Sequence, residues 1–221
     1  MCGRFAQAVP LGMLNRIDIF SNLNQQVLQS YNVTPGEMAS IILFREQPEI
    51  VISRWGFIIR HTKKPGADKL VINARSESCA EKYLFKNSFL HHRCLIPVSG
   101  FFEWKHEGAV KNPYFIYPDP SRNNDFSVLF LAGLYTITQD NSLLFTVITR
   151  ESSKNLRHIH GRMPLCIIPS ELYSWLNPQT SEDYLSVMIN KCYVSEFGTH
   201  RVSGAVNNAT DKTENCIKPA E

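Results

Sequence analysis

The sequence predicts an α+β fold, a single domain with a bent, barrel-like and mostly antiparallel sheet and a few peripheral helices. Strand-like runs dominate the middle of the chain, whereas helical patterns are few and short. The 221 residues are enough for one domain with a substantial core. With 43% apolar and 19% charged residues, the composition is that of an ordinary globular protein, which needs no disulfide or structural metal for stability.

The predicted elements begin with a helix over residues 10–23. A β-hairpin follows, in which residues 40–45 and 49–54 flank a turn that contains Pro48. Runs of apolar and β-branched residues predict further strands over residues 70–74, 94–99, 113–117, 126–131 and 143–149.

Cap signals predict three short helices. Ser78 and Glu81 form a capping-box pattern in front of a helix over residues 82–91. Two more helices are predicted near the C-terminus: residues 170–176, capped by Ser170, and residues 180–189, capped by Thr180 or Ser181. Two segments, 61–68 and 119–125, have the Pro, Gly and Asn content of loops, and we expect the polar tail over 209–221 to be loosely held.

The net charge and the cysteine positions restrict the expected partners and cellular location. A net charge of +3 is too mild to indicate nucleic-acid binding by itself, but it admits a polyanionic partner wherever basic residues cluster. The six cysteines include no CxxC pair, and the N-terminus lacks a secretory pattern, so we expect reduced thiols and a cytoplasmic location. No apolar run approaches the ~18 residues of a membrane span, so we expect no membrane association.

Cys2 directly follows the initiator methionine, and removal of Met1 gives it a free α-amino group. Such an amine has a pKa of about 7.7–8.0, against about 10.4 for lysine, so far more of it is neutral and nucleophilic at pH 7. With the neighbouring thiol it is a 1,2-aminothiol, which condenses with an aldehyde to an imine and then closes to a thiazolidine ring. A cysteine at position two is usually incidental, so the position alone decides nothing.

Two further segments carry candidate polar groups. Residues 71–77 end a strand with Asn73, Arg75 and Glu77 in front of a predicted helix, which fits either a functional strand end or a solvated helix-entry turn. Glu103 lies between aromatic residues, and a carboxyl desolvated in this way has the raised pKa of a general acid or base. The alternative is a strand in which Glu103 faces solvent, although the Phe101-Phe102 pair interrupts that alternation.

His158 and His160 are two residues apart, so in an extended segment both imidazoles point the same way. An HxH pair can ligate a metal, with His91-His92 as a source of a third ligand. It can equally supply one catalytic histidine beside Arg162, whose guanidinium suits a phosphate.

Several short motifs occur in a fixed order along nearly the whole chain. They are Met1-Cys2-Gly3-Arg4-Phe5, Tyr31-Asn32-Val33-Thr34-Pro35-Gly36, Trp55-Gly56, Asn73-Ala74-Arg75-Ser76-Glu77, Gly100-Phe101-Phe102-Glu103-Trp104, His158-Ile159-His160-Gly161-Arg162-Met163-Pro164 and Val202-Ser203-Gly204-Ala205-Val206-Asn207-Asn208. Each motif is weak, but the ordered set resembles the SRAP family (SOS response-associated peptidase). The resemblance implies one domain over residues 1–208 and a polar C-terminal tail over 209–221.

The resemblance also implies a chemistry. Family members remove their own initiator methionine, and the exposed cysteine forms a thiazolidine with the ring-opened aldehyde of an abasic site in single-stranded DNA, as part of the DNA damage response. Cys2 is then the nucleophile, and Asn73 orients the N-terminus and the sugar. Glu103 handles protons during imine formation and methionine release, and His160 assists sugar opening.

The partner implied by the resemblance is single-stranded DNA that contains abasic sites, bound by a monomer that is nucleoid-associated if bacterial. No metal and no organic cofactor is implied.

Some relatives carry a bulky aromatic pair after the Trp-Gly motif, which can wedge against DNA bases. This chain has Phe57-Ile58-Ile59-Arg60-His61 and a Lys-Lys-Pro-Gly loop there, so Ile58, Ile59 or the loop is left to act as the wedge. The expected DNA contacts are Arg4, Arg75 and Arg162 on phosphates, with Asn32, Pro35 and Thr149 along the channel.

Two rival functions remain open at the level of the sequence. One is a non-covalent module for single-stranded DNA in which Cys2 is vestigial. The other is a metal-dependent hydrolase that uses His158, His160 and a carboxylate.

Overall fold

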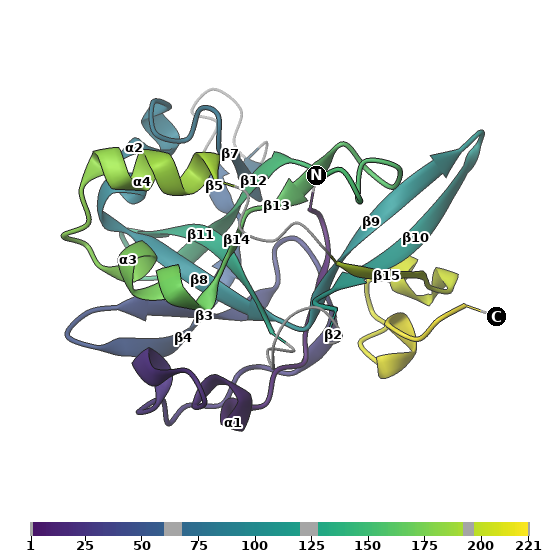
Figure 1. The fold of residues 1–221 in the computed structure, drawn as a ribbon, viewed down its shortest axis with the longest axis horizontal. Helices are drawn as coiled ribbons and strands as arrows, with labels where there is room; N and C mark the ends of the chain where they lie inside the picture. The colour runs from purple at the N-terminus through teal and green to yellow at the C-terminus, as the bar shows by residue number, and fades with distance from the viewer. Residues whose placement is uncertain (1, 60–67, 120–127, 192–196, 221) are drawn as a thin grey trace.

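A closed ring of strands forms the centre of the computed structural model, which describes residues 2–59, 68–119, 128–191 and 197–220 (Figure 1). Its five strands are β3 (Met38–Phe44), β4 (Pro48–Trp55), β8 (Arg93–Val98), β11 (Leu129–Ile137) and β12 (Leu143–Glu151). They pair in the order β4-β3-β8-β11-β12, and a short parallel pairing of β12 with β4 closes the ring. The other pairings in the ring are antiparallel.

Three short strands extend the ring: β7 (Asn73–Arg75), β13 (Arg162–Pro164) and β14 (Cys166–Ile167). β7 and β13 both pair with β12, so segments separated by nearly ninety residues in the chain flank the same strand. A separate two-stranded sheet consists of β5 (Phe57–Ile59) and β6 (Lys69–Val71).

A second sheet brings the N-terminus into the fold. Its order is β15-β10-β9-β1-β2, and its strands are β1 (Phe5–Gln7), β2 (Ser30–Val33), β9 (Gly100–Glu107), β10 (Val110–Tyr117) and β15 (Gly198–Arg201). β1 pairs with both β2 and β9, so the first residues of the chain lie between two strands. The β9–β10 hairpin projects from the body as an arm (Figure 1).

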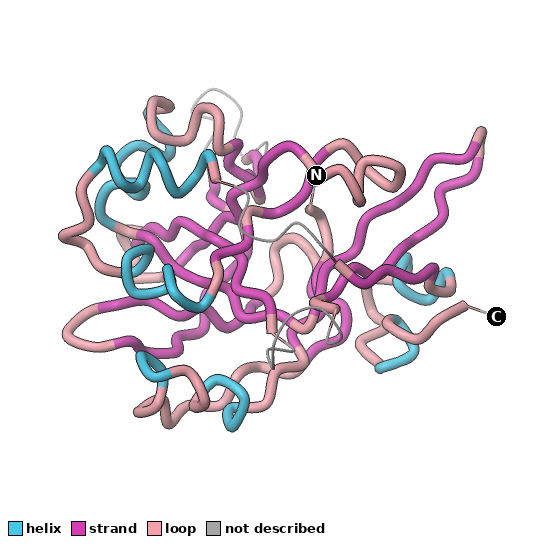
Figure 2. The backbone as a smooth tube through the Cα atoms, in the orientation of Figure 1, coloured by secondary structure: helices cyan, strands magenta, loops and turns pink. Residues whose placement is uncertain are grey.

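The helices are short and lie at the periphery of the strands (Figure 2). No helix in the described ranges is long and apolar enough to cross a membrane. The α-helices are α1 (Leu11–Leu14), α2 (Tyr83–His91), α3 (Leu172–Leu176) and α4 (Glu182–Asn190), and the 3-10 turns are η1 (Asp18–Phe20), η2 (Pro169–Glu171), η3 (Gly204–Asn207) and η4 (Glu214–Cys216).

Side-chain alternation along the ring strands divides the core in two. One cluster packs against the helices and includes Phe89 and Trp175. The other packs against β1 and β9, and its centre is Trp55, which stacks on Phe145 and contacts Phe5 at 4.8 Å between ring centroids. The predicted α+β class with a bent, mostly antiparallel sheet is therefore confirmed.

Most predicted strands are present with small shifts in their ends. The β3–β4 hairpin is confirmed, with Met38 opposite Arg54. The strand predicted over 70–74 is instead two strands that pair with different partners, β6 with β5 and β7 with β12. Between them, the Ile72 carbonyl accepts from Val147 N and from Trp55 Nε1, both at 3.0 Å. Part of the strand predicted over 126–131, and most of the two predicted loops, lie outside the described residues.

The helix predictions were less accurate. Only α1 and η1 form within residues 10–23, because Ile17 adopts an extended conformation and buries its side chain. The capping box at Ser78 is wrong: the residues after β7 form turns, and α2 begins at Tyr83 with Lys82 as its cap residue. Ser170 makes no cap bond, whereas the Ser181 hydroxyl accepts one from Tyr184 N as predicted.

The C-terminal tail is held more firmly than the sequence led us to expect. The buried Asn32 side chain donates to the carbonyls of Asn208 and Asp211, at 3.0 and 2.8 Å. Lys212 Nζ donates to the Asn32 carbonyl at 2.6 Å, and Cys216 is buried in a small third cluster. The last residues of the chain therefore pack against the sheet that contains β1.

Gln7 joins the two sheets through three hydrogen bonds. Its side-chain Nε2 donates to the carbonyls of Ser40 and Pro97, at 2.8 and 3.0 Å, and its Oε1 accepts from Ser40 N at 2.7 Å. Because Gln7 is completely buried, all three bonds are shielded from water and fix β1 on β3 and β8.

We predict that Gln7→Ala lowers the free energy of unfolding by about 3 kcal/mol, because it leaves buried backbone groups without partners. Chemical denaturation measures this value. Gln29→Ala is the matched control, since exposed Gln29 also donates to two carbonyls, and its loss should change stability by less than about 0.5 kcal/mol. Equal losses in the two variants would contradict the role of Gln7.

Candidate active site

Cys2 lies at the centre of the candidate site and is completely buried. The Asn73 side-chain Nδ2 donates to the Cys2 carbonyl at 2.8 Å, and the Cys2 Sγ contacts the Arg4 carbonyl at 3.8 Å. Asn73 is positioned by β7, whose pairing places it opposite Val147 of β12. The N-terminal segment is thus held at a defined place rather than left free, and Met1 itself lies outside the described residues.

Glu103 reaches the same place from β9. The pairing of Phe5 with Phe101 sets β9 beside β1, and Glu103 follows two residues later on the same face. The side chain is only 3% exposed, and this burial raises the pKa of Glu103 to about 7. At neutral pH the carboxyl group therefore exists in both protonation states, as a general acid or base requires.

The cysteine thiol is neutral in this environment. Burial raises the pKa of Cys2 to about 12, and the negative charge of Glu103 acts in the same direction. Glu103 and Cys2 are therefore close enough to interact electrostatically, and the buried sulfur is held as a protonated thiol.

His160 completes the group. Its Nδ1 lies 3.7 Å from Glu103 Oε2 and accepts a hydrogen bond of 3.0 Å from the Arg162 backbone N–H. The Arg162 carbonyl lies at the same distance of 3.0 Å from Nδ1, so this ring nitrogen can accept from the N–H or donate to the carbonyl according to the tautomer. Burial also lowers the pKa of His160, which favours the neutral ring.

The side-chain amide of Asn73 has one oxygen that can accept a further hydrogen bond. Its Oδ1 is buried and has no hydrogen-bond partner within the described part of the chain, whereas Nδ2 is used on the Cys2 carbonyl. A buried acceptor without a donor is unfavourable, so this oxygen is suited to a donor on the N-terminus or on a bound molecule. The structure thus brings together Cys2, Asn73, Glu103 and His160, the four residues expected to be catalytic.

The six residues expected to contact DNA differ in their exposure and in their hydrogen-bond partners. Arg75 and Pro35 are exposed. Arg4 is used inside the protein, where Nη1 donates to Asn32 Oδ1 and to the Val206 carbonyl, and Asn32 is itself fully buried. The remaining two are also engaged: Arg162 is ion-paired with Glu77, and Thr149 is buried and accepts from Arg162 through its carbonyl.

Glu77 is the functional candidate whose role the sequence did not reveal. It was visible only as the last residue of the Asn-Ala-Arg-Ser-Glu motif, with no partner assigned. The structure shows its carboxylate on both terminal nitrogens of Arg162, with one of the two contacts at 3.0 Å.

The premise of the metal interpretation is wrong. Residues 154–159 form turns rather than an extended segment, and His158 is exposed while His160 is half-buried, so the two imidazoles do not share a face. Within the described ranges no group of three or more His, Cys, Asp or Glu side chains is placed to hold a metal ion.

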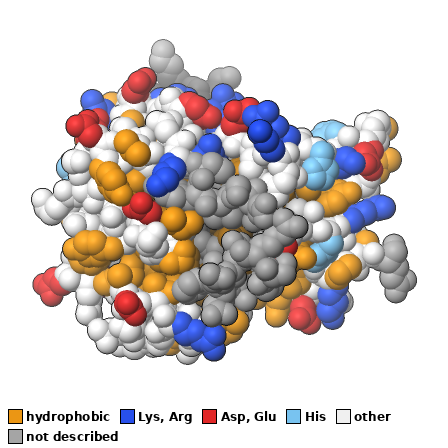
Figure 3. Space-filling view, viewed as in Figure 1, with side chains coloured by type: hydrophobic (Ala, Val, Ile, Leu, Met, Phe, Trp, Pro, Cys, Tyr) orange, Lys and Arg blue, Asp and Glu red, His pale blue; other side chains and the backbone are white. Residues whose placement is uncertain are grey.

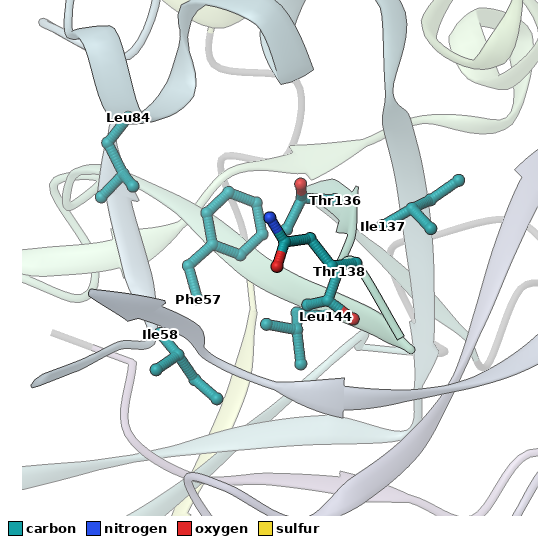
Figure 4. A pocket seen from close by; sticks show the side chains of 8 residues that line it. Phe57, Ile58, Leu84, Thr136, Ile137, Thr138 and Leu144 are labelled. Atoms are coloured by element: carbon teal, nitrogen blue, oxygen red, sulfur yellow. The ribbon is translucent and has the colours of Figure 1, made fainter. Parts of the chain in front are cut away.

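The wedge region is aliphatic. Phe57 of β5 is buried against Phe85, whereas Ile58 and Ile59 are exposed, and the following residues 60–67 lie outside the described part of the chain. Ile58 borders an open pocket of about 420 Å³, which Figure 4 shows from close by. Among the described residues that line that pocket none is charged, and the apolar ones are Phe57, Ile58, Leu84, Ile137 and Leu144.

On the face shown in Figure 3, Lys and Arg side chains are interspersed with Asp and Glu. The net charge of +3 agrees with this mixed surface. The described residues on that face therefore form no broad basic patch.

These features define a class of protein in which a cysteine beside the initiator methionine lies next to a buried carboxyl group, a half-buried histidine and an amide that binds its carbonyl. The chain belongs to the SOS response associated peptidase (SRAP) family, whose model matches residues 1–209. The family resemblance noted in the sequence is thereby confirmed.

Several relatives are named abasic site processing proteins. The abasic site processing protein YedK of Escherichia coli is 30% identical, with 99% of this chain and all of the relative covered. YoaM of Bacillus subtilis, also named an abasic site processing protein, is 31% identical, with 94% and 93% covered. A crystal structure of a Bacteroides thetaiotaomicron protein shares the fold, with a TM-score of 0.79 and 22% identity over the full length of both chains.

The raised pKa of Glu103 predicts a pH-dependent stability difference between the wild type and Glu103→Gln. The folded protein holds this proton up to about pH 7, whereas an unperturbed carboxyl loses it near 4.5, so folding binds a proton in that interval. The wild type should therefore lose stability relative to the variant as the pH rises from 4.5 to 7, by up to about 3 kcal/mol.

Denaturation of both proteins at a series of pH values measures this difference, and only its change with pH is diagnostic. A constant offset between pH 4 and pH 8 would mean that Glu103 titrates normally.

Proposed function

We propose that this protein processes abasic sites in single-stranded DNA by forming a covalent thiazolidine crosslink through Cys2 after removal of Met1. The observation that carries the proposal is the position of Cys2, which is held by Asn73 and lies within electrostatic reach of Glu103. The names of the relatives support abasic DNA as the substrate. This function belongs to the DNA damage response.

The first step is attack of the neutral Cys2 amine on the aldehyde of the ring-opened sugar, which gives a carbinolamine. Loss of water from the carbinolamine needs an acid, and Glu103, with a pKa of about 7, is protonated in a large fraction of molecules at neutral pH. His160 supports sugar opening by donating a proton to the ring oxygen. The product of this step is an imine.

Ring closure follows when the Cys2 thiol adds to the imine carbon. One C–S bond forms, the C=N bond becomes single, and the thiol proton is transferred to the ring nitrogen through Glu103. In total the aminothiol and the aldehyde give a thiazolidine and one water. Since the C=N bond is gone, the iminium that promotes strand cleavage by β-elimination is removed as well.

Release of Met1 uses the same groups in our proposal. The peptide bond between Met1 and Cys2 is hydrolysed by one water, which ionised Glu103 activates as a base. Asn73 holds the carbonyl on the other side of Cys2 and so fixes the residue whose nitrogen becomes the leaving group. An autopeptidase activity therefore precedes the DNA chemistry and generates the nucleophile for it.

The DNA backbone is bound by a small number of arginines. Arg75 is exposed at the end of β7, two residues from Asn73. It is the strongest candidate for a direct phosphate contact, because Arg4 and Arg162 already have protein partners. Arg4 and Arg162 contribute charge, and the fully buried Asn32 and Thr149 hold these two arginines in place rather than touching the DNA. Pro35 is exposed and can line the channel directly.

The requirement for both nucleophilic groups of Cys2 can be tested by denaturing electrophoresis with an abasic single strand. Mature wild type should form a stable adduct without reductant. Cys2→Ala keeps the amine and loses the sulfur, so it should form a stable adduct only when borohydride traps the imine, and it should nick the strand. Intact mass confirms that each protein has lost Met1.

Cys79→Ala is the control, because it removes another buried thiol that has no place in the site. This variant should behave as the wild type. Equally fast and stable crosslinking by Cys2→Ala without borohydride would identify a different nucleophile, and binding without any adduct would favour a non-covalent DNA-binding module.

The role of Arg75 predicts a change in salt dependence. Arg75→Ala should weaken binding to single strands of any sequence and reduce the slope of log affinity against log salt by about 0.7. Fluorescence anisotropy between low and moderate salt gives this slope. Arg157→Ala is the control, since Arg157 is also exposed but is paired with Glu151. If the two variants have the wild-type slope, the backbone is bound elsewhere.

A further inference from the structure

The C-terminal tail reaches the N-terminal segment through one buried side chain, Asn32 of β2. Asn32 Nδ2 donates to the carbonyls of Asn208 and Asp211, at 3.0 and 2.8 Å, and the Val206 carbonyl is a third acceptor at 3.3 Å. Carbonyl oxygens only accept hydrogen bonds, so the amide can face them only with its NH₂ group. The amide oxygen Oδ1 is therefore turned the other way, where it accepts from Arg4 Nη1 at 3.0 Å.

The same contacts determine which nitrogen of the Arg4 guanidinium faces outward. Nη1 carries two hydrogens and donates to two acceptors inside the protein, Asn32 Oδ1 and the Val206 carbonyl, the latter at 2.6 Å. Nε is buried. Nη2 is therefore the one nitrogen of the group that is neither hydrogen-bonded nor buried among the described residues. The cation lies over the Trp104 ring, with Cζ 5.9 Å from the ring centroid, and so beside the strand that carries Glu103.

Strand pairing alone does not place this guanidinium. It fixes the Arg4 backbone, since the Arg4 carbonyl accepts from Phe102 N at 3.0 Å. The guanidinium is separated from that backbone by several rotatable bonds, each with more than one staggered state. The two acceptors on Nη1 belong to β2 and to η3, and they select one of these states.

Residues beyond the end of the family match take part in this arrangement. The match ends at residue 209, whereas Asp211 and Lys212 follow it. Lys212 Nζ donates at 2.6 Å to the Asn32 carbonyl and to both oxygens of the Glu37 carboxylate, and it thereby keeps the neighbouring Asp211 carbonyl against the amide. The buried Cys216 Sγ contacts the Asp211 carbonyl at 3.5 Å. The carbonyl that orients the amide is therefore held from two sides.

We propose that the C-terminal tail is part of the DNA site: Asn32 and Lys212 are positioning residues that fix Arg4 with Nη2 facing outward, to donate to one phosphate of the strand. The proposal rests on the proposed function for its ligand, whereas the arrangement of the guanidinium concerns the free protein. A charge-assisted hydrogen bond to phosphate is strong, and a donor that is already held in place loses little entropy when it binds. The tail thus raises the affinity for DNA without touching it.

The orientation of Arg4 can be measured without DNA, from the ¹⁵N signals of its guanidinium. Rotation about the Cζ–Nε bond exchanges Nη1 with Nη2 unless one of them is held. We expect two slowly exchanging signals in the wild type and faster exchange in Asn32→Leu, which loses one acceptor on Nη1. That variant also leaves three carbonyls without their donor, so Lys212→Met is measured as well. It changes one half-buried side chain and should also speed up the exchange.

Lys218→Met is the matched control, because it removes the same charge from the same tail but its ammonium pairs with Glu214 rather than with Glu37. It should keep the wild-type signals and the wild-type affinity for single strands, measured by fluorescence anisotropy. Lys212→Met should bind about 5-fold more weakly, since one charge-assisted hydrogen bond to phosphate forms less often. In an Arg4→Ala background the same substitution should weaken binding no further, because both residues act through one contact.

Wild-type exchange between the Arg4 signals in both Asn32→Leu and Lys212→Met would overturn the proposal. An equal loss of affinity from Lys212→Met with and without the Arg4 side chain would also overturn it, and would make Lys212 itself the DNA contact. Wild-type affinity of Lys212→Met despite faster exchange would limit the tail to a structural role and likewise overturn it. Since the signals are recorded without DNA, absence of any adduct in the wild type would refute the proposed function alone.

Discussion

The pairing of β1 between β2 and β9 is the constraint on which the site depends. An N-terminus is ordinarily among the least ordered parts of a chain. Here the first strand is hydrogen-bonded on both edges and clamped by the buried side chain of Gln7, so Cys2 becomes part of the core. Because β9 is one of the two neighbours, the same pairing that fixes Cys2 also fixes Glu103 beside it.

Burial then shifts the pKa of each titratable group of the site toward its neutral form. Loss of solvent raises the pKa of both the Glu103 carboxyl and the Cys2 thiol and lowers that of His160, so each group is neutral more often than it would be in water. A neutral site suits a reaction between an amine and an aldehyde, in which a permanently charged acid or base would hold its proton too weakly or too strongly. Three groups of different chemistry are thus adjusted by one physical cause.

Much of the fold was predictable, because short-range patterns determine it. The β3–β4 hairpin and the Ser181 cap follow from local turn and cap chemistry. The closure of the ring did not follow, since it depends on a two-residue contact between β12 and β4. Neither did the break at Ile72, where the chain passes from pairing with β5 to pairing with β12. The capping-box pattern at Ser78 failed because the chain there turns to keep Ser76 on β12.

Cys2, Asn73, Glu103 and His160 were predicted from short motifs. The sequence gives the order of these motifs along the chain, but not how the strands that carry them are arranged in space. The glycine of the Gly-Phe-Phe-Glu-Trp motif that contains Glu103 has a packing role. A side chain on Gly100 would lie 2.5 Å from the Ile116 carbonyl, so only glycine lets β9 approach β10 closely here. The sequence could not show that Arg4 and Asn32 are engaged inside the protein, nor that Glu77 pairs with Arg162. Those partners lie 28 to 202 residues apart in the chain.

The long separations within the site also bear on synthesis at the ribosome. Cys2 is among the first residues to emerge, yet the bond from Asn73 to its carbonyl spans 71 residues, and Glu103 and His160 follow still later. Through most of translation the cysteine therefore belongs to an unfolded nascent chain, without acid, base or orienting amide. Contacts of such high sequence separation form late in folding, so a nascent or truncated chain has Cys2 without the groups that surround it in the folded protein.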